Sequence, residues 1–90
     1  MANQSIMQER VFKALANRRR IAIVLYLKKH KEAMVGEIAE AIRLSFKATS
    51  KHLNILAGSN ILEKEQRSLQ MFYRLSGEMP SATRSIIFLL

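Results

Sequence analysis

Residues 35–62 constrain the fold more than any other part of the chain, because they encode two short helices joined by a tight turn. Apolar residues at helical spacing predict a first helix over residues 35–43. Ser45 is a good N-cap for a second helix over residues 46–58. In that second helix, Thr49, Leu53 and Leu56 follow the i, i+4, i+7 spacing of a buried stripe. The pattern is typical of a helix-turn-helix.

The opposite face of the second helix carries small polar groups and cations. Lys47, Ser50, Lys51 and Asn54 share this face, and the sequence has no carboxylate between Glu40 and Glu63. Lysine can bind guanine edges or phosphates, asparagine can pair with adenine, and serine can hydrogen-bond to bases on either strand. Such a face suits a polyanion, and the alternative is an ordinary solvated helix surface. We therefore expect this helix to read DNA.

Three further residues join this predicted DNA-binding surface. Ser45 begins the helix, whose free backbone amides attract phosphate. Phe46 has two interpretations, contact with a thymine methyl group or packing into the core, and the sequence favours packing. Arg67 is expected at the tip of a hairpin, where it is a candidate phosphate contact. The full predicted set is Ser45, Phe46, Lys47, Ser50, Lys51, Asn54 and Arg67.

The remaining elements are short. We expect helices over residues 5–15 and 18–30, the second of them capped by Asn17. Strands are expected over residues 61–66 and 70–75, with a turn at 67–69, and a last helix is expected over residues 80–90. The chain has only three Gly and one Pro, which favours a mainly helical fold. The predicted fold is mainly α with a β-hairpin, in the order α-α-α-α-β-β-α of a winged helix-turn-helix.

Length and charge limit the class of protein. Ninety residues make a single domain, 1–90, and a net charge of +8 favours nucleic acid or an anionic membrane surface as partner. The chain has no cysteine. The N-terminal residues lack the pattern of a signal peptide, and the longest apolar run, 21–27, is far shorter than the ~20 residues that span a bilayer. We expect a soluble cytoplasmic protein without membrane association.

The C-terminus ends in five consecutive apolar residues, 86–90. A helix turns by ~100° per residue, so these side chains cannot all face one small core. An exposed apolar patch usually marks an interface, and the alternative is a frayed chain end. We therefore expect a homodimer in which helices 5–15 and 80–90 form the interface. The predicted interface residues are Ile6, Met7, Ile86, Ile87, Leu89 and Leu90, with Met79 as a further candidate.

Three segments resemble the ArsR/SmtB family of winged-helix transcriptional repressors. Residues 11–23 are similar to that family's LFKALADPTRLRI opening, residues 50–56 to its SRHLKVL signature, and residues 72–75 to the YYRL that closes its wing. The resemblance implies a homodimer that represses transcription from operator DNA. The chain departs from the family pattern at Arg18, where Pro is usual, and at Arg43 and Arg67-Ser68, where Gly is usual.

Other functions have less support in the sequence. Family members often bind metals through Cys, His or Asp/Glu, but the segment 35–40 has no Cys and the segment 80–90 has no His, Asp or Glu. We expect no metal site, no cofactor and no enzyme activity, since no phosphate loop or nucleophile elbow is present. The effector is unknown. The main alternative is a winged-helix module that binds an acidic protein through its basic surface, and a membrane-surface role ranks below both.

Overall fold

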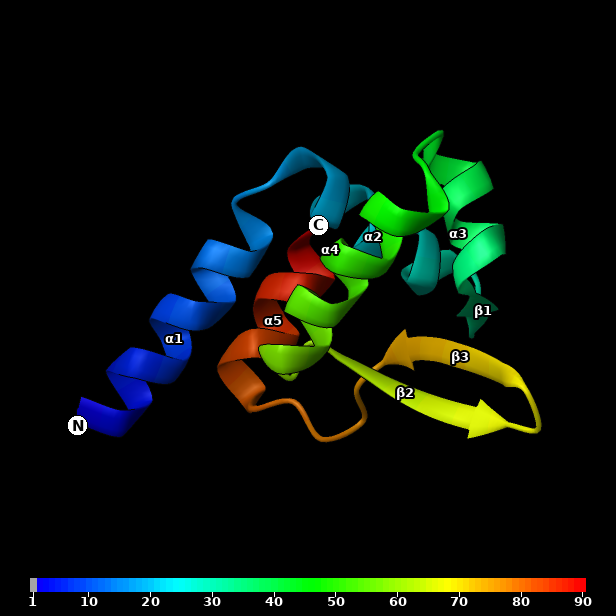
Figure 1. Ribbon diagram of the computed structural model, residues 1–90. Helices are drawn as coiled ribbons and strands as arrows, with labels where there is room; N and C mark the ends of the chain where they lie inside the picture. The colour runs from blue at the N-terminus through cyan, green and yellow to red at the C-terminus, as the bar shows by residue number, and fades with distance from the viewer. Residues whose placement is uncertain (1) are drawn as a thin grey trace.

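The computed structural model describes the backbone of residues 2–90 and the side chains of residues 5–90. The elements are α1 (Ala2–Leu15), α2 (Arg18–Lys29), β1 (Ala33–Met34), α3 (Val35–Ile42), α4 (Phe46–Gly58), β2 (Leu62–Arg67), β3 (Gln70–Leu75) and α5 (Ser81–Leu89). Figure 1 shows α1 extending from one end of the molecule and the β2–β3 hairpin from the other, with α5 lying between α1 and α4. This order confirms the predicted winged helix-turn-helix and adds one short strand.

Side chains cap two of the helices at the predicted positions. The Asn17 side chain accepts hydrogen bonds from the backbone N–H groups of Arg19 and Arg20, at 2.9 and 3.1 Å. Ser45 Oγ accepts the N–H of Ala48 at 3.1 Å. Both caps satisfy amides that have no partner within their own helix, so they fix where α2 and α4 begin.

The turn between α3 and α4 is left-handed at Arg43, where φ is 57° and ψ is 51°. The Leu44 N–H donates to Ala39 O at 3.0 Å and the Arg43 N–H to Glu40 O at 3.3 Å, which is a Schellman motif. A left-handed conformation is unfavourable for a residue with a Cβ, so the Gly usual in the family has a physical reason here. The predicted helix 35–43 therefore ends one residue earlier, at Ile42.

The sheet has three antiparallel strands in the order β1-β3-β2. Leu62 pairs with Leu75 and Arg67 with Gln70, so the turn is only Ser68-Leu69, and Ser68 takes a φ of 58°. Strand β2 is thus shifted by one residue from the predicted 61–66. Strand β1, which pairs Ala33 with Tyr73, was not predicted because two residues are too few to show an alternating pattern.

The core gathers residues from every helix and from the sheet. Its fully buried side chains include Ile23, Ile38, Leu53, Leu56 and Ile61. Among the described side chains of α1, those of Val11, Ala14 and Leu15 in the last two turns contribute, whereas residues 5–10 are all exposed. The buried stripe of α4 fixes how this helix is rotated on the core, and so it fixes which side faces solvent.

Thr49 is the polar member of that stripe. It is 0% exposed, and its Oγ1 has no hydrogen-bond partner among the described residues. Thr49→Val replaces this hydroxyl by a methyl group of similar size, and removal of a buried, unsatisfied hydroxyl should raise the free energy of unfolding by about 1 kcal/mol. Urea unfolding followed by circular dichroism measures this change.

Ser45→Ala is the control for that measurement. It removes the cap of the same helix and should lower the free energy of unfolding by about 1 kcal/mol. If Thr49→Val destabilised the protein instead, the hydroxyl would have a partner in solution.

Candidate nucleic-acid interface

The solvent side of α4 presents the residues predicted from the sequence. Lys47, Lys51 and Asn54 are exposed, and Ser50 is half-buried beside them. Within the described side chains, no ion pair or side-chain hydrogen bond engages any of these four. The two lysine ammonium groups and the Asn54 amide are therefore available to an external partner.

Phe46 does not pack into the core. It opens α4 with a side chain that is 62% exposed, which corrects the inward orientation favoured from the sequence. The Ser45 hydroxyl performs the local task at this helix start by capping Ala48, and Ile38 and Leu53 are among the side chains that fill the core nearby. Phe46 thus lies at the N-terminal end of α4, the end that usually approaches the bases in helix-turn-helix proteins.

Arg67 is not the free hairpin-tip cation that the sequence indicated. It is the last residue of β2, and its guanidinium donates to Glu32, just before β1, and to Glu65 Oε1 at 3.0 Å. The same guanidinium lies over the Phe72 ring, 4.4 Å from the ring centroid. Arg67 is therefore held back against its own sheet, and the tip carries Leu69, which is 96% exposed.

Arg74 extends this cluster along the hairpin. Its Nε donates to Glu63 at 2.7 Å and its Nη1 to Glu65 at 2.9 Å. Hydrogen bonds from Arg67 and Arg74 lower the pKa of Glu65 to about 2, and the hydrogen bond from Arg67 lowers that of Glu32. The carboxylates therefore stay charged at neutral pH. Three carboxylates face two guanidinium groups here, which leaves the cluster with one net negative charge.

Sequence reasoning missed this cluster, although the strand register contains a signal for it. Once β2 and β3 are aligned, Glu63 stands opposite Arg74 and Glu65 opposite Phe72. Opposite charges in such cross-strand pairs attract each other. Glu32 had no comparable signal, because it belongs to a loop 35 residues away from Arg67 in the sequence.

Since Arg67 is already paired, its removal should weaken DNA binding only slightly. We expect Arg67→Ala to change affinity for duplex DNA by less than about threefold, within the range of exposed charge contacts. Lys51→Ala removes one ammonium group from each protomer of the expected dimer, and at about 1 kcal/mol each this should cost about thirtyfold. Fluorescence anisotropy with a labelled duplex measures both. An Arg67→Ala loss as large as that of Lys51→Ala would mean that Arg67 leaves Glu32 to bind phosphate.

The terminal helices leave apolar side chains uncovered. Ile6, Met7, Leu89 and Leu90 are exposed, and Ile86 is half-buried. Ile87 and Met79 are exceptions, because they are 3% and 7% exposed and pack in the chain's own core. Their predicted places in the dimer interface are therefore wrong, and we assign both residues to the core.

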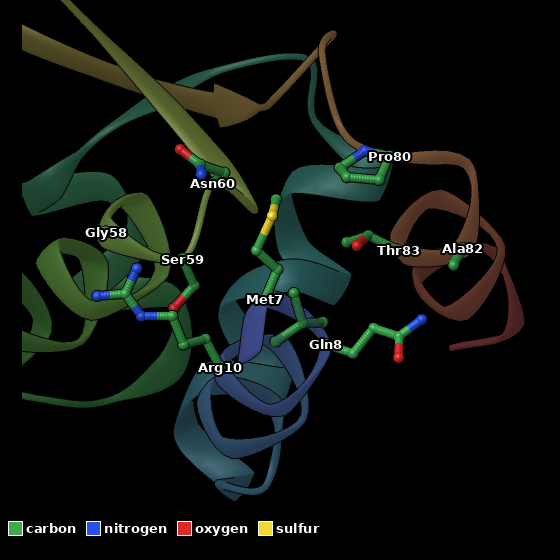
Figure 2. A pocket seen from close by; sticks show the side chains of 10 residues that line it. Met7, Gln8, Arg10, Gly58, Ser59, Asn60, Pro80, Ala82 and Thr83 are labelled. Carbon is green, nitrogen blue, oxygen red and sulfur yellow. The ribbon is translucent and has the colours of Figure 1, made fainter. Parts of the chain in front are cut away.

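A cavity of about 190 Å³ lies beside this apolar surface. Figure 2 shows it between α1, the end of α4 and the start of α5, with Met7 projecting between Asn60 and Pro80. Arg10 and Gln8 come from α1, and Thr83 from α5. Residues 7–11 of α1 and the first turn of α5 are thus not packed tightly against each other within one chain.

Two further observations concern metals and membranes. Within residues 5–90, no three His, Asp or Glu side chains come together as a group that could hold a metal ion. In the part of the chain that the structure describes, no helix combines the length and the hydropathy needed to cross a bilayer.

Residues 17–64 match the family model described as "Bacterial regulatory protein, arsR family". The chain belongs to the ArsR family. The matched region runs from the cap of α2 through α3 and α4 into β2, so it contains the whole helix-turn-helix. The resemblance drawn from the three sequence segments is thereby confirmed, and the family and fold are those of DNA-binding transcriptional regulators rather than of enzymes.

Individual proteins are similar to this chain as well. The arsenical resistance operon repressor of Escherichia coli is 34% identical over 77 residues, which cover 86% of this chain and 66% of that protein. The chain thus spans about two thirds of that repressor's length. A homodimeric winged helix-turn-helix DNA-binding domain of Mycobacterium bovis superposes with a TM-score of 0.86 at 30% identity, covering 98% of this chain and 78% of that one.

HlyU of Vibrio cholerae gives a TM-score of 0.83 at 30% identity, covering 99% of this chain and 92% of that one. The M. bovis and V. cholerae structures therefore both match nearly the whole chain, terminal helices included.

Proposed function

We propose that this ArsR-family regulator is a homodimeric repressor that places α4 of each protomer in the major groove of a palindromic operator. The observation that carries the proposal is the outward face of α4, which is exposed, cationic and free of carboxylates. The E. coli relative is named a repressor and the M. bovis domain is described as homodimeric, which supports the repressor and dimer parts of the proposal.

The residues of α4 have distinct proposed roles. Lys47 and Lys51 neutralise phosphate or bind guanine, and Asn54 pairs with adenine. Ser50, half-buried, serves as a short-range donor or acceptor, and Phe46 contacts thymine methyl groups from the helix start. The Ser45 end of α4, with its free backbone amides, receives a phosphate.

The proposed dimer forms through α1 and α5. Exposed apolar side chains occur on both helices, and residues 5–10 of α1 are all exposed. Burying Ile6, Met7, Ile86, Leu89 and Leu90 against a second copy removes this surface from water. A two-fold axis then sets the two α4 helices about 34 Å apart, in successive major grooves.

We also propose that the repressor does not sense metals. Thiolate ligands are excluded by the absence of cysteine. His30 follows the end of α2 and His52 lies on α4, and among the described side chains no three His, Asp or Glu form a group that could hold a metal ion.

Selection of bound sequences from random duplex DNA tests the proposal. We expect an inverted repeat whose half-sites lie about 10 base pairs apart, with affinity falling by roughly one log unit per log unit of salt for each phosphate neutralised. Enrichment of no sequence, combined with tight binding to an acidic protein, would instead support the interaction-module alternative.

A further inference from the structure

Arg20 connects three helices, α1, α2 and α4, through polar contacts. It lies in the first turn of α2, and its Nε donates to Ala14 O at 2.6 Å, while Nη2 donates to Lys13 O at 3.4 Å. Both acceptors are carbonyls of the last turn of α1. On its other side, Arg20 Nη1 lies 3.2 Å from Nδ1 of His52, in the middle of α4.

The contact with His52 requires a neutral imidazole. A guanidinium has only donors, so Nδ1 must accept with its lone pair and the ring proton must be on Nε2. Protonation of the ring would place an N–H on Nδ1, directed at the Arg20 N–H groups. The contact would then be lost, and two cations would face each other.

Among the described side chains, the charged groups that act on the pKa of His52 are all cations. Burial is the largest cause that lowers the pKa of His52 below 6.5. The cations Arg20 and Arg19 on α2 and Lys51 on α4 lower it further. From α1, the Lys13 carbonyl accepts from Arg20 rather than from His52, and the Lys13 ammonium group pairs with Glu9 at 3.7 Å. No carboxylate hydrogen-bonds to His52 among the described side chains.

The position of the contact links the two parts of the proposed function. The cationic guanidinium of Arg20 stabilises the negative end of the α1 dipole, and α1 is a proposed interface helix. His52 directly follows Lys51 on the proposed reading helix. A displacement of the end of α1 therefore reaches α4 through a single side chain.

We infer that Arg20 and His52 are positioning residues for DNA recognition, through which the end of α1 holds α4 in its reading orientation only while His52 is neutral. This inference rests on the proposed function. Neither residue need touch DNA. The contribution of the Arg20–His52 contact to the free energy of unfolding is fully present above pH 6.5. It is lost as the pH falls through the lowered pKa of His52.

The ratio of affinities for operator and for random DNA, measured between pH 8 and pH 5, tests the inference. Protonation raises the positive charge of the protein and so its affinity for any duplex, and this common gain largely cancels in the ratio. For the unmodified protein we expect it to fall about tenfold, as for the loss of one hydrogen bond to a charged group. His52→Asn keeps an acceptor near the position of Nδ1 but does not titrate, so its ratio should change less than about threefold.

His30→Asn is the matched control, because His30 is the only other histidine and is exposed at the end of α2. It should keep the full pH dependence of the unmodified protein. Arg20→Lys keeps the charge but lacks the planar fork, so its ratio should already be low at pH 8 and should stay flat. A pH-independent ratio in the unmodified protein, or an unchanged pH dependence in His52→Asn, would overturn the inference.

NMR of the free protein provides a readout that needs no DNA. The ¹⁵N shifts of His52 should show the Nε2–H tautomer and a pKa below 6.5, and amides of Ala14 and Leu15 should titrate together with those around His52. A Nδ1–H tautomer, or a His52 titration that leaves the end of α1 unchanged, would refute the link. If the protein selected no operator sequence at pH 8 but gave the expected NMR results, only the proposed function would be refuted.

Discussion

Lys47→Ala combined with Lys51→Ala should reduce affinity for the selected operator by about a thousandfold. A dimer presents four of these ammonium groups, and loss of each at about 1 kcal/mol adds up to about 4 kcal/mol, or three orders of magnitude. The slope of log affinity against log salt should also become less steep, by roughly one for each phosphate contact removed. Anisotropy titrations at several salt concentrations measure both quantities.

Lys29→Ala combined with Lys31→Ala is the control for that experiment. Both lysines are exposed near the end of α2, and the double change removes the same net charge without touching α4. Its affinity should stay within about tenfold of the unmodified protein, since only long-range attraction is weakened. Equal losses in the two double variants would show that overall charge, not the face of α4, determines binding.

Ile6→Glu should convert the protein to a monomer and reduce operator affinity by about a hundredfold or more. Ile6 is 56% exposed on the first half of α1, and a carboxylate there would be buried against the partner in the proposed interface. Each protomer would then bind one half-site alone. It would lose the gain in affinity from a linked second site, which is typically 10²–10⁴-fold. Sedimentation equilibrium measures the oligomeric state, and anisotropy measures the affinity.

Leu25→Glu is a matched change outside the terminal helices. Leu25 is 43% exposed on α2, so the variant places a carboxylate on a comparable exposed apolar side chain. It should remain dimeric and keep most of its affinity. If Ile6→Glu sedimented as a dimer with unchanged affinity, the dimer would have to form through a surface other than α1.

The helices could be predicted from the sequence because their signals are local. Asn17 and Ser45 cap their helices through hydrogen bonds to amides two or three residues away, and Thr49, Leu53 and Leu56 are spaced for one buried face. Neither signal depends on distant parts of the chain. The position and orientation of α4 therefore followed from residues 45–56 alone.

The features that were not predicted correctly from the sequence depend on contacts between distant segments. Strand β1 exists only because Ala33 and Met34 pair with β3, and the state of Arg67 depends on Glu32. Phe46 looked like a core residue because nothing local shows that other apolar side chains already fill the space. The contacts of Arg20 left no local signal, because its acceptors come from α1 and from α4.

Directed cleavage of DNA tests the central claim, that the outward face of α4 enters the duplex, most directly. The chain has no cysteine, so Ser50→Cys provides a unique thiol for an iron–EDTA group, and Leu25→Cys provides a control away from α4. With the selected operator, the Ser50→Cys conjugate should cleave within the major groove of each half-site, and the Leu25→Cys conjugate should not. Cleavage absent from Ser50→Cys, while the conjugate still binds the operator specifically, would contradict the account.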